Sequence, residues 1–185
     1  MACDPHYNIH LITGKVQGGK TTLLSQLVER LKKDKLKITG FLSHGSFNEG
    51  QRSGFTLVDL EHGKQIPLAT TEEKPGWLNF RRFFFNPEAF KEGEQWIHNG
   101  LSQHPDLVVI DEVGPMELER QGWWNILKHL VKRYDIPQLW IVRDQILPEI
   151  AEKWNVPEEN IFRVDSSDQT ELMESLTIKL INTKR

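Results

Sequence analysis

Hydrophobic and polar residues follow two periods along this chain, and these periods divide it into strands and helices. Residues 7–13 form a short, largely apolar run, which predicts a buried strand. After a glycine-rich stretch, apolar residues recur at helical spacing with polar and charged residues between them, at Leu23, Leu24, Leu27, Val28 and Leu31. The beginning of the chain therefore predicts a strand, a glycine-rich turn and an amphipathic helix.

The same two periods continue to the end of the chain. Apolar or alternating runs predict further strands at 36–43, 54–60, 65–69, 106–111, 138–143 and 161–165. Helical spacing predicts helices at 88–101, 123–134 and 147–154, and a last helix that a capping box of Asp168 and Glu171 opens. Asn86 and Pro87 supply a cap and a first-turn proline for the first of these helices. We expect a polar loop at 46–53, whereas 79–85 fits a strand and a buried turn equally well.

The order of the predicted elements favours an α/β fold. Strands separated by helices are typical of a parallel sheet that is covered on both faces. Within the run 106–111, residues 107–110 are continuously apolar and Asp111 follows them, as expected for a central parallel strand. Residues 54–69 instead predict a hairpin with Gly63 in its turn, so we expect an antiparallel insertion or edge on that sheet.

Composition narrows the class of protein. A chain of 185 residues with 38% hydrophobic and 26% charged residues can form its own core, and we expect one domain over 1–185. The single cysteine, Cys3, cannot form an internal disulfide, and the start of the chain has no signal-peptide pattern, so we expect a cytoplasmic protein. No membrane-length apolar run is present, and a net charge of -3 gives no general attraction to nucleic acid.

A phosphate-binding motif lies between the first predicted strand and helix. Residues 14–21, GKVQGGKT, satisfy GxxxxGK[ST] at every fixed position. Glycines let successive backbone N–H groups face a phosphate, and the following helix presents its positive end to the same anion. Lys20 is expected beside the β- and γ-phosphates, and the Thr21 hydroxyl is expected to bind Mg²⁺.

An acidic pair ends the buried strand at 106–111. Open α/β sheets bind ligands at the carboxyl ends of their strands, where this chain places Asp111 and Glu112. We expect Asp111 to hold the Mg²⁺ and Glu112 to activate a water molecule for attack on the γ-phosphate. Gly114 and Pro115 then force a turn.

These motifs together resemble the small nucleoside-triphosphatase family of RecA-like P-loop proteins. The segments that carry the resemblance are GKVQGGKTT, GFLS, QRSGFTLVDL with IPLA, and VVIDEVGPMEL, which span about the first two-thirds of the chain. The resemblance implies a three-layer, RecA-like fold with a mostly parallel central sheet, and Mg²⁺-dependent hydrolysis of ATP, GTP and other nucleoside triphosphates. Lys15, Val16 and Gln17 depart from the family's commoner loop, and 70–85 matches it poorly.

The resemblance also implies two nucleotide-contacting segments. The first is Gly14, Lys15, Val16, Gln17, Gly18, Gly19, Lys20, Thr21 and Thr22. The second is Leu107, Val108, Val109, Ile110, Asp111, Glu112, Val113 and Gly114.

Cations and aromatic rings complete the candidates. Arg52, Arg81, Arg82 and Arg143 could neutralise charge during phosphoryl transfer, and Arg143 follows the strand next after the acidic one. We therefore expect Lys20, Glu112 and Arg143 to be the catalytic residues. Trp123 and Trp124 fit either a base-stacking or a core role.

Two other functions use the same motifs. A nucleotide or nucleoside kinase would pass the γ-phosphoryl group to an acceptor, with Arg81 and Arg82 on a mobile lid. A nucleotide-switched module would bind an unidentified protein partner through an exposed turn at 115–121. We favour the nucleoside triphosphatase, because a water-activating Glu112 would waste ATP in a kinase.

Overall fold

The computed structural model describes residues 8–15, 19–133, 135–164 and 169–183. Within these ranges one sheet of nine strands has the order β5-β6-β4-β3-β2-β7-β8-β1-β9. The strands are β1 (Ile9–Thr13), β2 (Ile38–Asn48), β3 (Gln51–Asp59), β4 (Gln65–Thr70), β5 (Leu78–Phe80), β6 (Phe83–Phe85), β7 (Leu107–Val113), β8 (Gln138–Val142) and β9 (Ile161–Arg163). The helices are α1 (Lys20–Lys33), α2 (Pro87–Leu101), α3 (Pro115–Leu118), α4 (Trp124–Arg133), α5 (Leu147–Lys153) and α6 (Gln169–Thr183).

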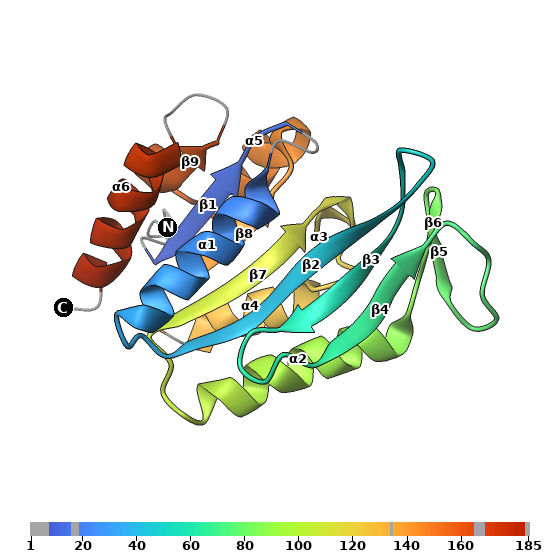
Figure 1. Cartoon of the computed structure of the whole chain (residues 1–185), viewed down its shortest axis with the longest axis horizontal. Helices are drawn as coiled ribbons and strands as arrows, with labels where there is room; N and C mark the ends of the chain where they lie inside the picture. The colour runs from blue at the N-terminus through green and yellow to red at the C-terminus, as the bar shows by residue number, and fades with distance from the viewer. Residues whose placement is uncertain (1–7, 16–18, 134, 165–168, 184–185) are drawn as a thin grey trace.

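Helices cover both faces of the parallel part of the sheet, which gives three layers (Figure 1). Side chains along β7 alternate between two cores: Val108 and Ile110 pack with α2, α4 and α5, whereas Leu107 and Val109 pack with α1 and α6. All four side chains are fully buried. This alternation explains why the strand is apolar at successive positions, and it confirms the predicted three-layer α/β fold.

Only half of the sheet is parallel. Strands β2, β7, β8, β1 and β9 pair in parallel, whereas β3, β4, β6 and β5 extend the sheet through antiparallel pairs. The predicted hairpin is present as β3 and β4, with Gly63 in its turn at φ +70°. The antiparallel part is larger than one hairpin, so the description "mostly parallel" does not hold for this chain.

The polar loop predicted at 46–53 is wrong. Strands β2 and β3 continue through this segment and join by a two-residue turn, since Asn48 pairs with Gln51. Glu49 and Gly50 both have positive φ, at +48° and +77°, as a type I′ hairpin turn requires. The segment lacks strand-like alternation because most of its side chains, from Ser46 to Gln51, are exposed.

The segment 79–85, which the sequence left between a strand and a turn, contains both. Strands β5 and β6 form a short hairpin, and Arg81 and Arg82 lie in its turn. Arg81 has a φ of +56°. The three phenylalanines of β6 are half-buried, and β6 lies between β4 and the edge strand β5.

The helices lie close to their predicted positions. The Asn86 side chain accepts a hydrogen bond from the Glu88 N–H, 3.1 Å away, and so caps α2 as predicted. The five apolar residues predicted for the buried face of α1 are all buried. Tyr7, Tyr134 and the Asp168 cap lie outside the described residues. Within the described ranges, no helix has the length and apolar character needed to cross a membrane.

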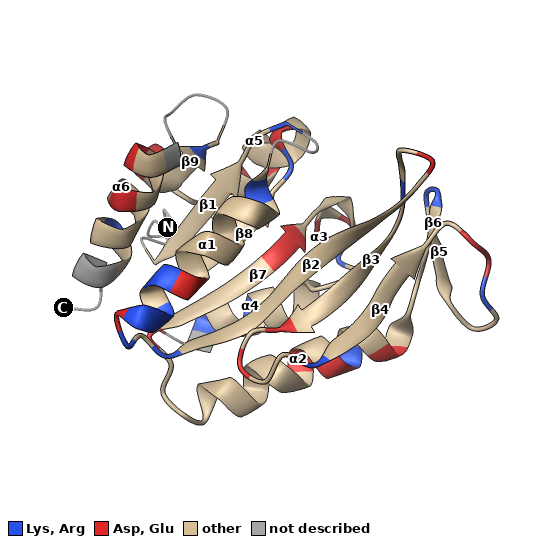
Figure 2. Ribbon diagram, in the orientation of Figure 1, with Lys and Arg blue, Asp and Glu red and all other residues tan. Residues whose placement is uncertain are grey.

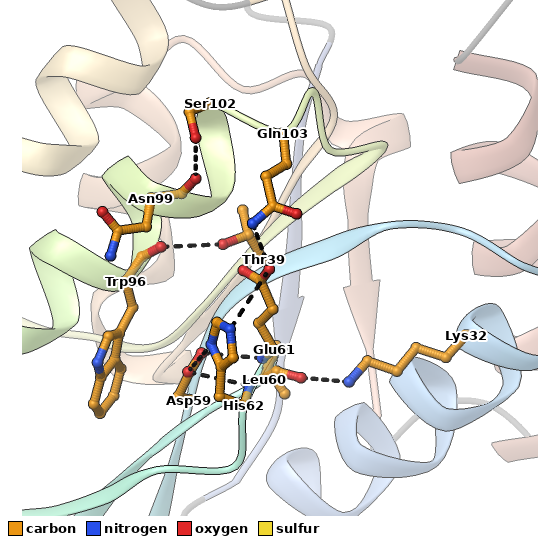
Figure 3. A network of polar contacts seen from close by, with 10 residues as sticks. All are labelled: Lys32, Thr39, Asp59, Leu60, Glu61, His62, Trp96, Asn99, Ser102 and Gln103. Atoms are coloured by element: carbon orange, nitrogen blue, oxygen red, sulfur yellow. Dashed lines mark hydrogen bonds and ion pairs between the residues drawn. The ribbon is translucent and has the colours of Figure 1, made fainter.

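A polar network fixes the β3–β4 turn to two helices (Figure 3). The buried Asp59 carboxylate accepts from the backbone N–H groups of Glu61 and His62, at 3.0 and 3.1 Å. Lys32 of α1 donates to the Leu60 carbonyl, and Gln103 beyond α2 donates to Glu61. These contacts lie at the amino end of β2. They are therefore remote from the carboxyl ends of the parallel strands, where open α/β sheets bind their ligands.

Candidate functional site

The residues of both predicted motifs converge where the parallel strands end and α1 begins. A cleft of about 960 Å³ opens there, and its wall includes Gly19, Lys20, Thr21, Thr22, Glu112 and Arg143. Figure 2 shows the acidic end of β7 beside the start of α1. Because α1 follows β1 directly and β7 lies two strands away, the sheet order brings these distant segments together.

Lys20 occupies the first turn of α1 and is buried. Its ammonium group donates to the carbonyl oxygens of Gly14 and Lys15, at 2.7 and 2.6 Å. Gly19 precedes it with a φ of +81°, in the left-handed region that favours glycine. The carbonyl groups of Gly14 and Lys15 thus lie against the lysine ammonium, and the first residues of the helix line the cleft.

Asp111 lies at the end of β7 and is fully buried. Its Oδ2 atom accepts from the Thr21 hydroxyl at 3.2 Å and from the Ser43 N–H at 2.9 Å. Its Oδ1 atom has no hydrogen-bond partner among the described residues. Burial, and after it the charge of Glu112, raise the pKa of Asp111 above its ordinary value.

These groups fit a divalent cation. A hydroxyl and a carboxylate are the hard oxygen ligands that Mg²⁺ prefers, and the buried, unpaired Oδ1 has a lone pair available. A cation would also offset the cost of burying an ionised carboxylate.

Glu112 projects from an irregularity in β7. Ile110 pairs with Trp140 and Val113 pairs with Val142, so β7 holds one more residue than β8 over this interval. This bulge places Glu112 at a φ of +64°, an unusual value for a non-glycine residue. Bulges re-aim side chains, and this one turns Glu112 into the cleft while Val113 returns to the core.

Arg143 follows β8 and forms an ion pair with Glu112. The guanidinium donates to Oε2 of Glu112 through Nη2 at 3.0 Å and Nε at 3.3 Å. Both side chains line the cleft. The sequence placed Arg143 after the strand that follows the acidic one, but it gave no indication that the arginine contacts Glu112.

The other candidate arginines lie on the antiparallel side of the cleft. Arg52 lies between the rings of Phe47 and Phe55, with its guanidinium carbon 4.9 and 5.0 Å from the ring centres. Arg82 donates to the Arg52 carbonyl at 2.9 Å. Arg52 and Arg82 both line the cleft, whereas Arg81 does not.

A second hollow of about 320 Å³ adjoins the cleft. Its wall includes six aromatic residues, Phe55, Phe80, Phe83, Phe85, Phe90 and Trp123, and we call it the aromatic pocket. Phe55, Arg82, Phe83, Glu112 and Arg143 line both spaces. Trp123 is almost fully buried and contributes to its wall, so this residue has a core role and also borders a pocket. Trp124 packs against Trp154 and lines neither space.

Glu117 was not singled out by the sequence as a functional candidate, although it is almost completely buried. Its carboxylate accepts from the N–H groups of Gly114 and Trp123, at 2.6 and 2.7 Å. Burial raises the pKa of Glu117 to about 7. Met116 is also buried, so the partner surface expected at 115–121 is not an exposed turn over its whole length.

The remaining predicted contact residues are placed as follows. Gly14 is buried and Lys15 is exposed, whereas Val16, Gln17 and Gly18 lie outside the described residues. The side chains of Leu107, Val108, Val109 and Ile110 are fully buried in the two cores and line neither space. Gly114 lines the aromatic pocket. Ser43, whose N–H contacts Asp111, was missed, although the parallel pairing of β2 with β7 places it beside the end of β7.

The fold and the site together define a P-loop protein of the nucleoside-triphosphatase class. The sequence profile of a family described as NTPase matches residues 9–177. The nucleoside-triphosphatase THEP1 of Archaeoglobus fulgidus is 31% identical over 170 residues, which cover 90% of this chain and 94% of that protein. The corresponding protein of Methanosarcina acetivorans is 29% identical over 172 residues, with 92% and 95% covered. The chain therefore belongs to this nucleoside-triphosphatase family and is an enzyme of that class.

Two solved structures share the fold. The crystal structure of THEP1 from Aquifex aeolicus has a TM-score of 0.71 at 21% identity, and covers 91% of this chain and 96% of that one. The solution structure of a human cancer-related nucleoside triphosphatase has a TM-score of 0.68 at 23% identity, with 91% and 95% covered.

Proposed function

We propose that this protein hydrolyses nucleoside 5′-triphosphates, including ATP and GTP, to the diphosphate and phosphate with Mg²⁺ as cofactor. One observation carries the proposal: Thr21 at the start of α1 is hydrogen-bonded to Asp111 at the end of β7, and the adjacent Glu112 lines the same cleft. The residues that we assign to the metal ion and to the attacking water thus lie side by side.

Each residue has a separate role in this proposal. Lys20 and the N–H groups at the start of α1 bind the phosphates. Thr21 and Asp111 would hold the metal ion, which would supply positive charge to offset that of the triphosphate. Glu112 accepts a proton from the attacking water. Arg143 orients the Glu112 carboxylate and, since it lines the cleft, offsets charge on the transferring phosphoryl group.

Broad substrate specificity is part of the proposal. The groups that it assigns to binding contact phosphates and metal, and these are the same in every nucleoside triphosphate. We therefore expect ATP, GTP, CTP and UTP all to be hydrolysed.

Phosphate release by the purified protein with each of the four triphosphates and Mg²⁺ tests the proposal. Lys20→Ala should abolish release, because it removes the cation beside the phosphates. Lys33→Ala, an exposed lysine in the last turn of the same helix, is the matched control and should retain full activity. Release that persists in Lys20→Ala would contradict the assignment.

A further inference from the structure

The aromatic pocket meets the cleft at the residue that we assign to the attacking water. Glu112 and Arg143 line both spaces, whereas Lys20 and Thr21 line the cleft alone. In an in-line displacement, the attacking oxygen approaches the γ-phosphorus from the side opposite the bridging oxygen. With the phosphates bound at the start of α1, the attacking water is therefore expected at the border between the two spaces, where Glu112 projects.

A second polar side chain lies in the wall of the pocket. Ser43 lines the pocket and is buried, with only 1% of the residue exposed. Its hydroxyl has no hydrogen-bond partner in the part of the chain that the structure describes. Buried hydroxyls normally have a partner, so this one indicates a small polar molecule that binds here during function.

Strand pairing places Ser43 beside Glu112. Strands β2 and β7 lie side by side (Figure 1), and Phe41 of β2 pairs with Ile110 of β7. Ser43 and Glu112 each follow this pair by two residues. The Ser43 N–H also donates to Asp111 at 2.9 Å, which fixes the backbone at this point.

The Ser43 hydroxyl faces the pocket and not the proposed metal ligands. Side chains alternate between the two faces of a strand, and Phe41, two residues before Ser43, packs in the core with α2, α4 and α5. Thr21 belongs to α1, which covers the other face of the sheet. The hydroxyl is therefore directed away from Thr21.

The other polar side chains of the pocket are less suited to accept a hydrogen bond from this water. Three arginines line the pocket, Arg81, Arg82 and Arg143. A guanidinium group donates hydrogen bonds and accepts none. Each carboxylate oxygen of Glu117 already accepts from a backbone N–H group. A serine hydroxyl has lone pairs that accept, so Ser43 can take the second O–H of a water whose first O–H is bonded to Glu112.

We propose that Ser43 is a catalytic residue that binds the attacking water together with Glu112. The water donates one hydrogen bond to each side chain, so that a lone pair on its oxygen points toward the γ-phosphorus. This oxygen forms a bond to the phosphorus while the bond from the phosphorus to the bridging oxygen breaks, and that electron pair stays on the diphosphate. The proton of the water passes to Glu112, and Ser43 keeps its own proton. The proposal rests on the proposed hydrolysis and adds a residue to it.

Substitution of Ser43 tests this role. Ser43→Ala should lower kcat for phosphate release by roughly 10 to 100-fold, because the water loses one of its two orienting contacts. Calorimetric binding of a non-hydrolysable ATP analogue with Mg²⁺ should be unchanged. Ser43→Thr keeps the hydroxyl and should restore most of the activity. Ser46→Ala changes an exposed serine of the same strand that lines neither space, and it should behave as the unaltered protein.

Two results of these measurements would overturn the proposal. One is a kcat in Ser43→Ala equal to that of the unaltered protein. The other is a loss of kcat that is matched by weaker binding of the analogue, because the hydroxyl would then contact the triphosphate and not the water.

Stability separates this role from a structural one. The Ser43 hydroxyl makes no hydrogen bond within the described residues, so its removal should leave the urea midpoint of unfolding unchanged or slightly raised. A clearly lowered midpoint in Ser43→Ala would show that the hydroxyl is bonded within the folded protein, and it would overturn the proposal.

A double-mutant cycle tests whether Ser43 and Glu112 act on the same water. Single-turnover release of labelled phosphate is measured for Ser43→Ala, Glu112→Gln and the double variant. In the Glu112→Gln background, Ser43→Ala should lower the rate by a much smaller factor than in the unaltered protein, because residues that act as a unit are not additive. Equal factors in both backgrounds would mean independent roles and overturn the proposal. Absence of phosphate release by the unaltered protein would instead contradict the proposed hydrolysis.

Discussion

At the scale of single residues, Glu112 combines an unusual backbone conformation with a defined partner. The bulge in β7 imposes its positive φ, which costs free energy, and the Arg143 ion pair helps to offset this cost. Strain of this kind is typical of functional sites. The pair holds the carboxylate inside the cleft.

Replacement of Glu112 by Gln tests its role as the base. The amide cannot take a proton from water, so hydrolysis should fall by roughly 10² to 10⁴-fold while nucleotide binding persists. Phosphate release and calorimetric binding of a triphosphate measure the two effects. Glu119→Gln, the same change at an exposed position after α3, is the control and should behave as the unaltered protein. Unchanged turnover in Glu112→Gln would exclude this base.

Arg143 gives a second prediction at this scale. Arg143→Ala removes both the contact that orients Glu112 and a cation from the cleft, so kcat should fall by roughly 10² to 10³-fold. Steady-state phosphate release checks this. Arg163→Ala alters an exposed arginine whose ion pair lies with Glu158, and kcat should stay at the level of the unaltered protein. A kcat that survives in Arg143→Ala would show that neither contribution matters.

Glu117 predicts a dependence of stability on pH. Its pKa is about 7 in the folded protein against 4.5 as the ordinary value, so the folded state holds the proton more tightly. Stability from this group is therefore present below about pH 4.5 and is lost as the pH rises toward 7, by at most about 1.4 kcal/mol per pH unit.

Urea unfolding of Glu117→Gln between pH 5 and pH 8 measures this effect. Gln does not titrate, so the stability difference between the unaltered protein and the variant should shrink as the pH rises. His10, whose pKa burial lowers to about 4, has the opposite slope between about pH 4 and 6.5, but it is present in both proteins and cancels. A difference that is constant over this range would refute the prediction.

At the scale of elements, α2 approaches β2 so closely that one helix position requires glycine. A Cβ at Gly100 would overlap the side chain of Thr39, which is itself buried. The two elements therefore pack backbone against side chain. Helix propensity alone favours alanine over glycine by roughly 0.5 to 1 kcal/mol. Packing and propensity therefore predict opposite effects of alanine at this position on the free energy of unfolding.

Gly100→Ala should lower the free energy of unfolding, by roughly 1 to 3 kcal/mol, because the buried Thr39 cannot move away. Urea denaturation measures the change. Glu92→Ala, an exposed position in the same helix, should be neutral or slightly stabilising. A more stable Gly100→Ala protein would show that α2 can shift away from the sheet.

At the scale of the whole molecule, the site joins the start of α1 to the end of β7, so its ligands should stabilise the entire fold. Binding to the folded state alone adds about 2.7 kcal/mol at a ligand concentration 100 times Kd. Mg²⁺ with a triphosphate should therefore raise Tm, and EDTA should reverse much of this rise.

Thr21→Ala is expected to remove most of the Mg²⁺-dependent part of this rise, because it deletes the proposed hydroxyl ligand. Thermal unfolding with and without EDTA measures the difference. Thr71→Ala changes an exposed threonine outside both spaces and should leave the rise intact. An equal rise in Thr21→Ala would contradict the metal assignment.

Most elements were predictable from the sequence because the residues that face the core recur with the period of the helix or strand. The buried face of α1, the cap of α2 and the apolar β7 all belong to this group. The extension of β2 and β3 beyond the core was not predictable, since a strand that is exposed on both faces does not alternate between apolar and polar residues. The acidic pair of β7 was found from the sequence, whereas its bulge depends on the register with β8.

The sequence alone determined the kind of chemistry, because a phosphate loop and an acidic strand end are local patterns whose residues lie close together along the chain. Only the tertiary structure decided which groups meet: Ser43 on Asp111, Arg143 on Glu112, and the aromatic rings around the second pocket. These contacts join segments far apart in the chain, so they depend on strand order and on how closely the elements pack. Local periodicity carries no information about either.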